Sequence, residues 1–139
     1  MLNRFDRAVL SYKPEFVVIT GGINDVVSNE SLEKIKFNIE EMVTKSVKNN
    51  IIPIIGLPTP VDFEPWERIL SKLRDWMISY ANQGGVEIIN FANAFFNDDG
   101  SIKTDLLLDD GGHPTREGYK QMFKQINPAI FQKGLGQRG

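Results

Sequence analysis

The chain has 139 residues, of which 41% are hydrophobic and 24% charged, and its formal net charge is −2. This length suffices for one domain with its own core. The slightly acidic balance argues against a nucleic-acid binder, which usually presents a basic face. No run approaches about 18 apolar residues, so no membrane span is expected. The absence of cysteine excludes disulfides, thiolate catalysis and a cysteine-based zinc site.

The first 20 residues predict a short helix followed by a strand. Leu2, Phe5, Val9 and Leu10 fall on one side of a helix over about 2–11. The apolar run at 16–19 is typical of a strand buried on both faces. No signal-peptide pattern is seen in these residues, which favours a cytoplasmic location.

Two helix–strand pairs follow. Apolar residues recur at helical spacing over 31–48, where Asn29 or Ser31 could cap the start. A second apolar run at 51–55 predicts a strand. A further amphipathic pattern covers 65–81, with Pro65 in the first turn and Gly84-Gly85 as its stop. The run at 86–89 predicts a third strand.

A last helix is predicted from 115 onward, with Thr115 as its N-cap. Its expected buried face consists of Tyr119, Met122, Phe123 and Ile126, and Pro128 should break or kink it. The alternation of helices and strands indicates a parallel sheet with helices on its faces. We expect a single domain over residues 1–133 and a disordered tail over 134–139.

Three segments follow strands or precede the last helix and should meet at one edge of the sheet: 20–25, 56–60 and 109–114. Ligands of open parallel sheets bind at this edge. His113, the only histidine, lies three residues after Asp110. A carboxylate there can fix the imidazole tautomer and leave the other ring nitrogen as a base. The alternatives are a surface or packing histidine and an aspartate that only shapes the turn.

Asn24 follows two glycines at the end of the first strand. Glycine allows a tight turn and close approach of a substrate, and an amide side chain can donate to a developing oxyanion. An ordinary Asn-Asp turn is the alternative. A phosphate-binding loop is weakly supported, because neither glycine-rich phosphate motif is present.

Two of these stretches resemble conserved blocks of the SGNH hydrolases, also called GDSL-type lipases or esterases. Residues 17–25 resemble the block in which a strand leads into Gly-x-Asn-Asp, and residues 110–119 resemble the Asp-x-x-His-Pro block and its helix. The resemblance implies a flavodoxin-like three-layer α/β/α fold. It also implies hydrolysis of a small-molecule carboxylic ester without a metal or organic cofactor.

The resemblance also implies a role for each residue that matches a conserved position of these blocks. His113 matches the general base, Asp110 its orienting acid, Asn24 the oxyanion donor, and Gly22 the glycine of the same block. The Gly-Asp-Ser block with the nucleophilic serine has no counterpart in this sequence. We therefore expect a fold truncated at the N-terminus to about three strands, and a chain that is inactive as given.

The alternative to an esterase is a non-catalytic flavodoxin-like module that binds a small ligand or another protein.

In the family's sheet, the missing first strand would lie beside residues 16–19, so this apolar strand becomes an unprotected edge. We expect a homodimer in which two such edges pair.

Overall fold

The computed structural model describes Phe5, Ser11 and residues 14–131. Three strands form one sheet in the order β1-β2-β3: β1 (Phe16–Ile19), β2 (Ile52–Gly56) and β3 (Glu87–Ile89). Both pairings are parallel, with Phe16 opposite Ile52 and Ile54 opposite Glu87. The parallel sheet predicted from the apolar runs is thereby confirmed.

The helices of the described part connect and cover these strands. They are α2 (Ile23–Val27), α3 (Leu32–Lys48), α4 (Glu64–Gly84) and α5 (Arg116–Phe123), with 3-10 helices η2 (Phe91–Phe95) and η3 (Thr104–Leu106). The longest, α3 and α4, follow the predicted ranges 31–48 and 65–81. None of the described helices is long and apolar enough to cross a membrane.

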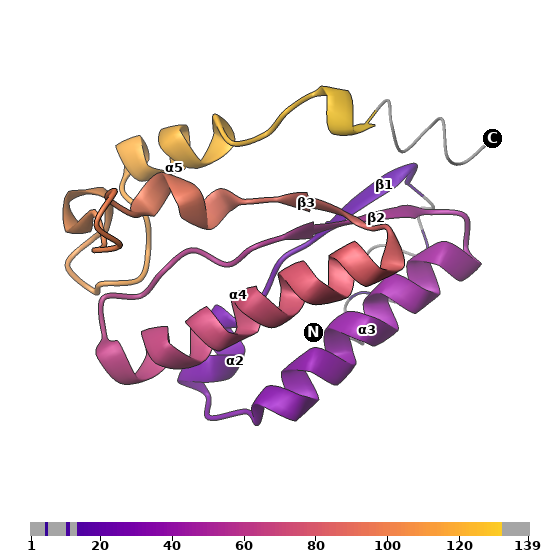
Figure 1. The fold of residues 1–139 in the computed structure, drawn as a ribbon, viewed down its shortest axis with the longest axis horizontal. Coiled ribbons are helices and arrows are strands. Elements are labelled where there is room, and N and C mark those ends of the chain that lie inside the picture. Colours follow the sequence, from indigo (N-terminus) through magenta and orange to yellow (C-terminus); the bar gives the residue numbers. More distant parts are fainter. Residues whose placement is uncertain (1–4, 6–10, 12–13, 132–139) are drawn as a thin grey trace.

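The sheet is covered on both faces. On one face α3 and α4 enclose the larger apolar cluster, which includes Ile39 and Leu73. On the other face, Met122 and the C-terminal segment 126–131 pack on Ile54 and Ile89 of the sheet. Figure 1 shows α3 and α4 below the sheet and α5 above it, so the fold has three layers, as expected.

Helix ends follow local rules of capping. Ser31 accepts a hydrogen bond from the Lys34 amide at 3.2 Å, and Thr115 accepts one from the Gly118 amide at 3.0 Å. Gly85 ends α4 in the left-handed conformation, with a φ of 68°. Asn29, the other candidate cap of α3, has a φ of 62° and lies before the cap.

The predicted buried face of the last helix is partly wrong. Tyr119 and Phe123 are 44% and 60% exposed, whereas Met122 and Ile126 are half-buried. The helix is oriented by Gly118, where an added Cβ would lie 2.5 Å from the Leu106 carbonyl oxygen. It ends at Phe123, before Pro128 is reached.

Two predictions on the chain ends concern residues outside the described part. The helix predicted over 2–11 falls there except for Phe5, which is buried, and Ser11, which is exposed. The tail predicted to be disordered, 134–139, falls there entirely.

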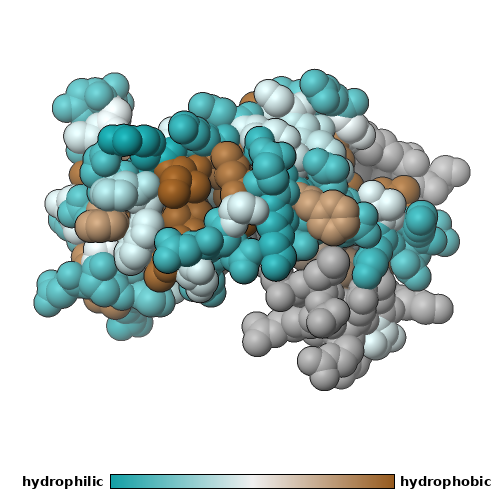
Figure 2. Space-filling model, turned by 90° about the horizontal axis from the view of Figure 1, so that it is seen from below, coloured by the Kyte–Doolittle hydropathy of each residue, from teal (hydrophilic) through white to brown (hydrophobic). Residues whose placement is uncertain are grey.

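Within the described residues, β1 pairs with β2 on one side only. Val18 in this strand is 37% exposed. On the face seen from below, further apolar side chains gather left of centre among hydrophilic ones (Figure 2). The sheet edge and this lower face therefore both bring apolar surface to the outside.

Gly22 joins β1 to α2 at a position that strongly favours glycine. Its φ is 109°, a conformation that residues with a side chain rarely adopt. An added Cβ would lie 2.5 Å from the Leu73 Cδ2 atom of α4. The glycine therefore allows α2 to pack against α4.

We predict that Gly22→Ala lowers the free energy of unfolding by about 2–5 kcal/mol, from backbone strain and overpacking together. The matched control is Gly84→Ala, whose Cβ would meet only the Val86 side chain at 3.7 Å. This control should be neutral or slightly stabilising, because it lies in a helix. Urea denaturation of both variants measures the difference, and equal stabilities would contradict the prediction.

Candidate active site

The segments that follow β1 and β2 and precede α5 lie at the carboxyl ends of the strands, on the left in Figure 1. Residues 57–62, called here the 57–62 segment, run from β2 to α4. Residues 108–113, the 108–113 loop, precede α5. The Asp62 amide donates to the Gly111 carbonyl oxygen at 2.6 Å, so these two segments are in direct contact.

The 108–113 loop is closed by its own backbone. The Leu108 amide donates to the His113 carbonyl oxygen at 2.8 Å, and the Gly111 amide donates to the Leu108 carbonyl oxygen at 2.9 Å. Gly111 has a φ of 75°, which allows the tight turn. The closed loop brings the side chains of Asp110 and His113 together.

Asp110 is the centre of this loop. Its Oδ1 atom accepts hydrogen bonds from the Gly112 and His113 amides, each at 2.9 Å. Its Oδ2 atom pairs with Nδ1 of the His113 ring. The Gly112 amide foremost, then the His113 amide and the His113 ring, stabilise the ionised carboxylate and lower the pKa of Asp110 to about 2.

These contacts leave one nitrogen of His113 available for chemistry. Since the ionised Asp110 carboxylate can only accept a hydrogen bond, Nδ1 must donate it, and the neutral imidazole carries its proton on Nδ1. The Nε2 atom is then the basic nitrogen, and the His113 side chain is 75% exposed. The arrangement can therefore take a proton from a hydroxyl group that approaches from outside.

Asn24 lies in the first turn of α2, rather than in an isolated Asn-Asp turn. It is exposed, and within the described residues its side chain makes no hydrogen bond. Its amide is thus available to a ligand. No hydrogen bond joins it to Asp110 or His113 in the same part of the chain, so its role as their partner stays a prediction.

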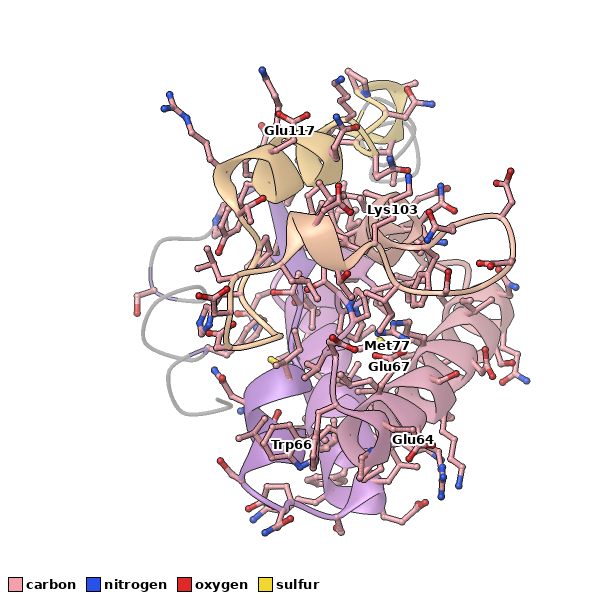
Figure 3. All side chains as sticks on the ribbon, turned by 90° about the vertical axis from the view of Figure 1, so that its left-hand side faces the viewer. Glu64, Trp66, Glu67, Met77, Lys103 and Glu117 are labelled. Atoms are coloured by element: carbon pink, nitrogen blue, oxygen red, sulfur yellow. The ribbon has the colours of Figure 1, made fainter. Side chains whose placement is uncertain are left out.

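The sequence reasoning missed a buried ion pair beside this site. Arg74 and Glu67 of α4 pair at 2.7 Å, and Arg74 is 7% exposed. Figure 3 shows Glu67 toward the middle of the molecule and Glu64 on the outer side of α4. The signal was available, because residues seven apart lie on the same face of a helix.

A groove with a cavity volume of about 660 Å³ lies between the first half of α4 and residues 96–102. Arg74, Phe63 and Phe96 line it, but neither Asp110 nor His113 does. We therefore locate the candidate site by the hydrogen bonds of Asp110 and not by this groove. No group of three or more acidic or histidine side chains that could hold a metal ion occurs among the described residues.

We predict that the Asp110 carboxyl titrates near pH 2, well below its ordinary pKa of 3.8. Since the folded pKa is the lower one, the contribution of ionised Asp110 to stability is complete above about pH 4 and is lost toward pH 2. The stability difference between the wild type and Asp110→Asn should therefore shrink over this range. Carboxyl ¹³C NMR and acid denaturation measure both effects. A measured Asp110 pKa of 3.8 or above would contradict the prediction.

Solved structures resemble this chain over most of its length. A protein of the G-D-S-L family from Desulfitobacterium hafniense DCB-2 is 33% identical, with a TM-score of 0.80, and the match covers 89% of this chain and 70% of that one. A GDSL-like lipase from Bacteroides thetaiotaomicron VPI-5482 is 25% identical, with a TM-score of 0.83, and the match covers 95% of this chain and 69% of the lipase.

An acetylxylan esterase from Geobacillus stearothermophilus, solved as a catalytic mutant, shares the fold at 18% identity, with a TM-score of 0.76 and coverages of 96% and 65%. No curated protein matches the chain. The model of the GDSL-like Lipase/Acylhydrolase family matches residues 1–121. This match and the structural likeness agree with the sequence resemblance, and the chain belongs to the GDSL-like lipase/acylhydrolase family.

Proposed function

We propose that the chain carries the base, the orienting acid and the side-chain oxyanion donor of a Ser-His-Asp ester hydrolase. The observation that carries this proposal is the pairing of Asp110 with His113 Nδ1, which leaves Nε2 for proton transfer on a side chain that is 75% exposed. Membership of the family supports the reaction class.

In this proposal, His113 Nε2 takes the proton of a serine hydroxyl as that oxygen attacks the ester carbonyl. The Asn24 amide donates a hydrogen bond to the oxyanion that forms. Gly22 provides the tight turn that brings Asn24 to the start of α2. His113 then gives the proton to the leaving alcohol. Water, activated by the same nitrogen, releases the acid from the serine. Asp110 keeps the ring in place throughout.

The nucleophile is the part of this proposal that residues 1–139 do not supply. None of their seven serines follows a strand in a Gly-Asp-Ser setting. Ser28, the serine nearest to Asn24 in sequence, is the residue that ends α2. We infer that a catalytic serine would come from a Gly-Asp-Ser segment beyond these residues, and that the 139 residues alone are inactive.

We predict that residues 1–139 hydrolyse p-nitrophenyl acetate no faster than an exposed imidazole does. A fluorophosphonate probe should leave the chain unlabelled, because no activated serine is present. Mass spectrometry of the treated chain gives the readout. A labelled serine, with loss of turnover on labelling, would overturn the proposed absence of a nucleophile.

The roles of the two side chains are tested in a protein that also contains a Gly-Asp-Ser strand ahead of these residues. There, His113→Ala should lower kcat by about 10³–10⁵-fold and Asn24→Ala by about 10²–10³-fold. Asn82→Ala, an exposed asparagine of α4, is the matched control and should leave kcat unchanged. Unimpaired turnover by His113→Ala would show a function other than the proposed one, such as ligand binding without catalysis.

We also propose that residues 1–139 form a homodimer through β1. The strand pairs on one side only within the described residues and contains neither proline nor charge. Two copies could join their β1 edges antiparallel about a two-fold axis, which would satisfy the free backbone groups. Val18 of this strand is 37% exposed, so pairing would also bury apolar surface.

Sedimentation equilibrium should therefore report twice the chain mass of 15.7 kDa. Val18→Lys, which adds a charge at the proposed edge, should yield monomers, because two lysines would face each other near the two-fold axis. The matched control is Val47→Lys on α3, an exposed valine that should leave the dimer intact. A wild-type monomer at high micromolar concentration would overturn this proposal.

A further inference from the structure

We infer that Arg74 and Glu67 are positioning residues for His113, acting through the 57–62 segment and the 108–113 loop. This inference rests on the proposed role of His113 as the base. Neither residue lies in the blocks 17–25 and 110–119, on which the resemblance to the family rests. The inference comes from one continuous set of contacts that runs from α4 to the candidate site.

The first link is the buried pair itself. The Arg74 Nη1 atom donates to Glu67 Oε2 at 2.7 Å, and the Nη2 atom donates to Oε1 at 3.0 Å. The two side chains are only 9% and 17% exposed. Side chains on a helix lean toward its N-terminus, so the long Arg74 side chain can reach back two turns to Glu67. A buried guanidinium needs such a bidentate partner.

The second link joins this pair to the 57–62 segment. The Arg74 Nε atom donates to the Pro58 carbonyl oxygen at 2.7 Å, and the Val61 amide donates to Glu67 Oε1 at 3.2 Å. Leu57 to Val61 are all buried. Buried backbone groups need hydrogen-bond partners. The Leu57 amide still finds one in β3, at the Ile89 carbonyl oxygen, but the segment then leaves the sheet. Arg74 and Glu67 take over that function.

The third link joins the segment to the site. The Asp62 amide, next to Val61, donates to the Gly111 carbonyl oxygen at 2.6 Å. A Cβ added to Gly111 would meet Asp62 backbone and side-chain atoms at 3.4–3.8 Å, so the two chains are closely packed. Gly111 directly follows Asp110 in the 108–113 loop. The position of Asp110, and through it of the His113 ring, therefore depends on the 57–62 segment.

The chemistry requires arginine at position 74. Its guanidinium donates in three directions, to two carboxylate oxygens and one carbonyl oxygen, and it lies 5.4 Å from the centre of the Phe96 ring. A lysine carries the same charge but cannot reproduce this planar set of donors. Arg74→Lys should therefore keep the positive charge but not the position of the 108–113 loop.

The same helix offers a matched control. Arg68 and Glu64 form an ion pair at 2.6 Å, but both side chains are 67% exposed, and within the described residues the pair makes no hydrogen bond to the 57–62 segment. Arg68→Met removes the same chemical group from α4 as Arg74→Met does. Exposed ion pairs contribute little to stability. A difference in behaviour between Arg74→Met and Arg68→Met therefore measures the effect of the buried contacts that Arg74 makes.

The test is amide hydrogen exchange by NMR on residues 1–139. The amides of Gly112 and His113, which both bind Asp110, report the loop, and the amides of Ile54 and Ile55 in β2 report global stability. In Arg74→Met the exchange of the loop amides, relative to the β2 amides, should rise at least about tenfold. Arg74→Lys should raise it several-fold and Arg68→Met less than about twofold. If Arg74→Met does not fold, Glu67→Gln, which keeps one acceptor oxygen, provides the same comparison.

The ring of His113 gives a second readout, since the chain has a single histidine and hence one set of ring signals. Its chemical shifts should change in Arg74→Met toward those of Asp110→Asn and stay unchanged in Arg68→Met. In Arg74→Met, the exchange rates of the loop and β2 amides could instead rise by the same factor while the His113 ring signals stay unchanged. Arg74 would then stabilise the whole fold without positioning His113, and the inference would be overturned. Because no ester turnover is measured, this outcome is distinct from failure of His113 as the catalytic base.

Discussion

The parallel pairing of β2 with a strand on each side is the constraint on which the candidate site depends. Parallel strands need crossover connections, and their carboxyl ends all point to one edge. Residues distant in sequence are thereby brought together: a Cβ added to Gly56 would lie 2.7 Å from the Thr20 Cγ2 atom and from the Phe91 ring. The sheet thus determines where the site lies before any of its side chains is considered.

The chemistry of the site, by contrast, is local in sequence. Two backbone amides and one ring nitrogen, all within three residues of Asp110, bind its carboxylate. A carboxylate held in this way stays ionised down to about pH 2, because the hydrogen bonds favour the charged form. The same bonds orient the histidine. The hydrogen bonds that pair the acid with the base therefore all lie within the loop itself.

The interior contributes through the connection between the sheet and α4. Segments that leave a sheet while still buried carry backbone groups without partners. Here Arg74 and Glu67 bind the Pro58 carbonyl and the Val61 amide. Two ionised side chains in a buried place are costly unless each is fully hydrogen-bonded. Their cost is offset by contacts to each other and to the segment that supports the 108–113 loop.

The sequence by itself determined the three strands, the helices α3, α4 and α5, the parallel sheet and the Asp110–His113 pair, because apolar periodicity, capping residues and a three-residue spacing are local properties. It did not reveal α2, the exposure of Tyr119 and Phe123, or the contact of Arg74 with Pro58. These depend on how elements pack: Gly118 against Leu106 turns α5, and the path of the 57–62 segment brings Pro58 to Arg74. Only the tertiary structure decides such contacts, since they join residues whose separation in the chain carries no periodic signal.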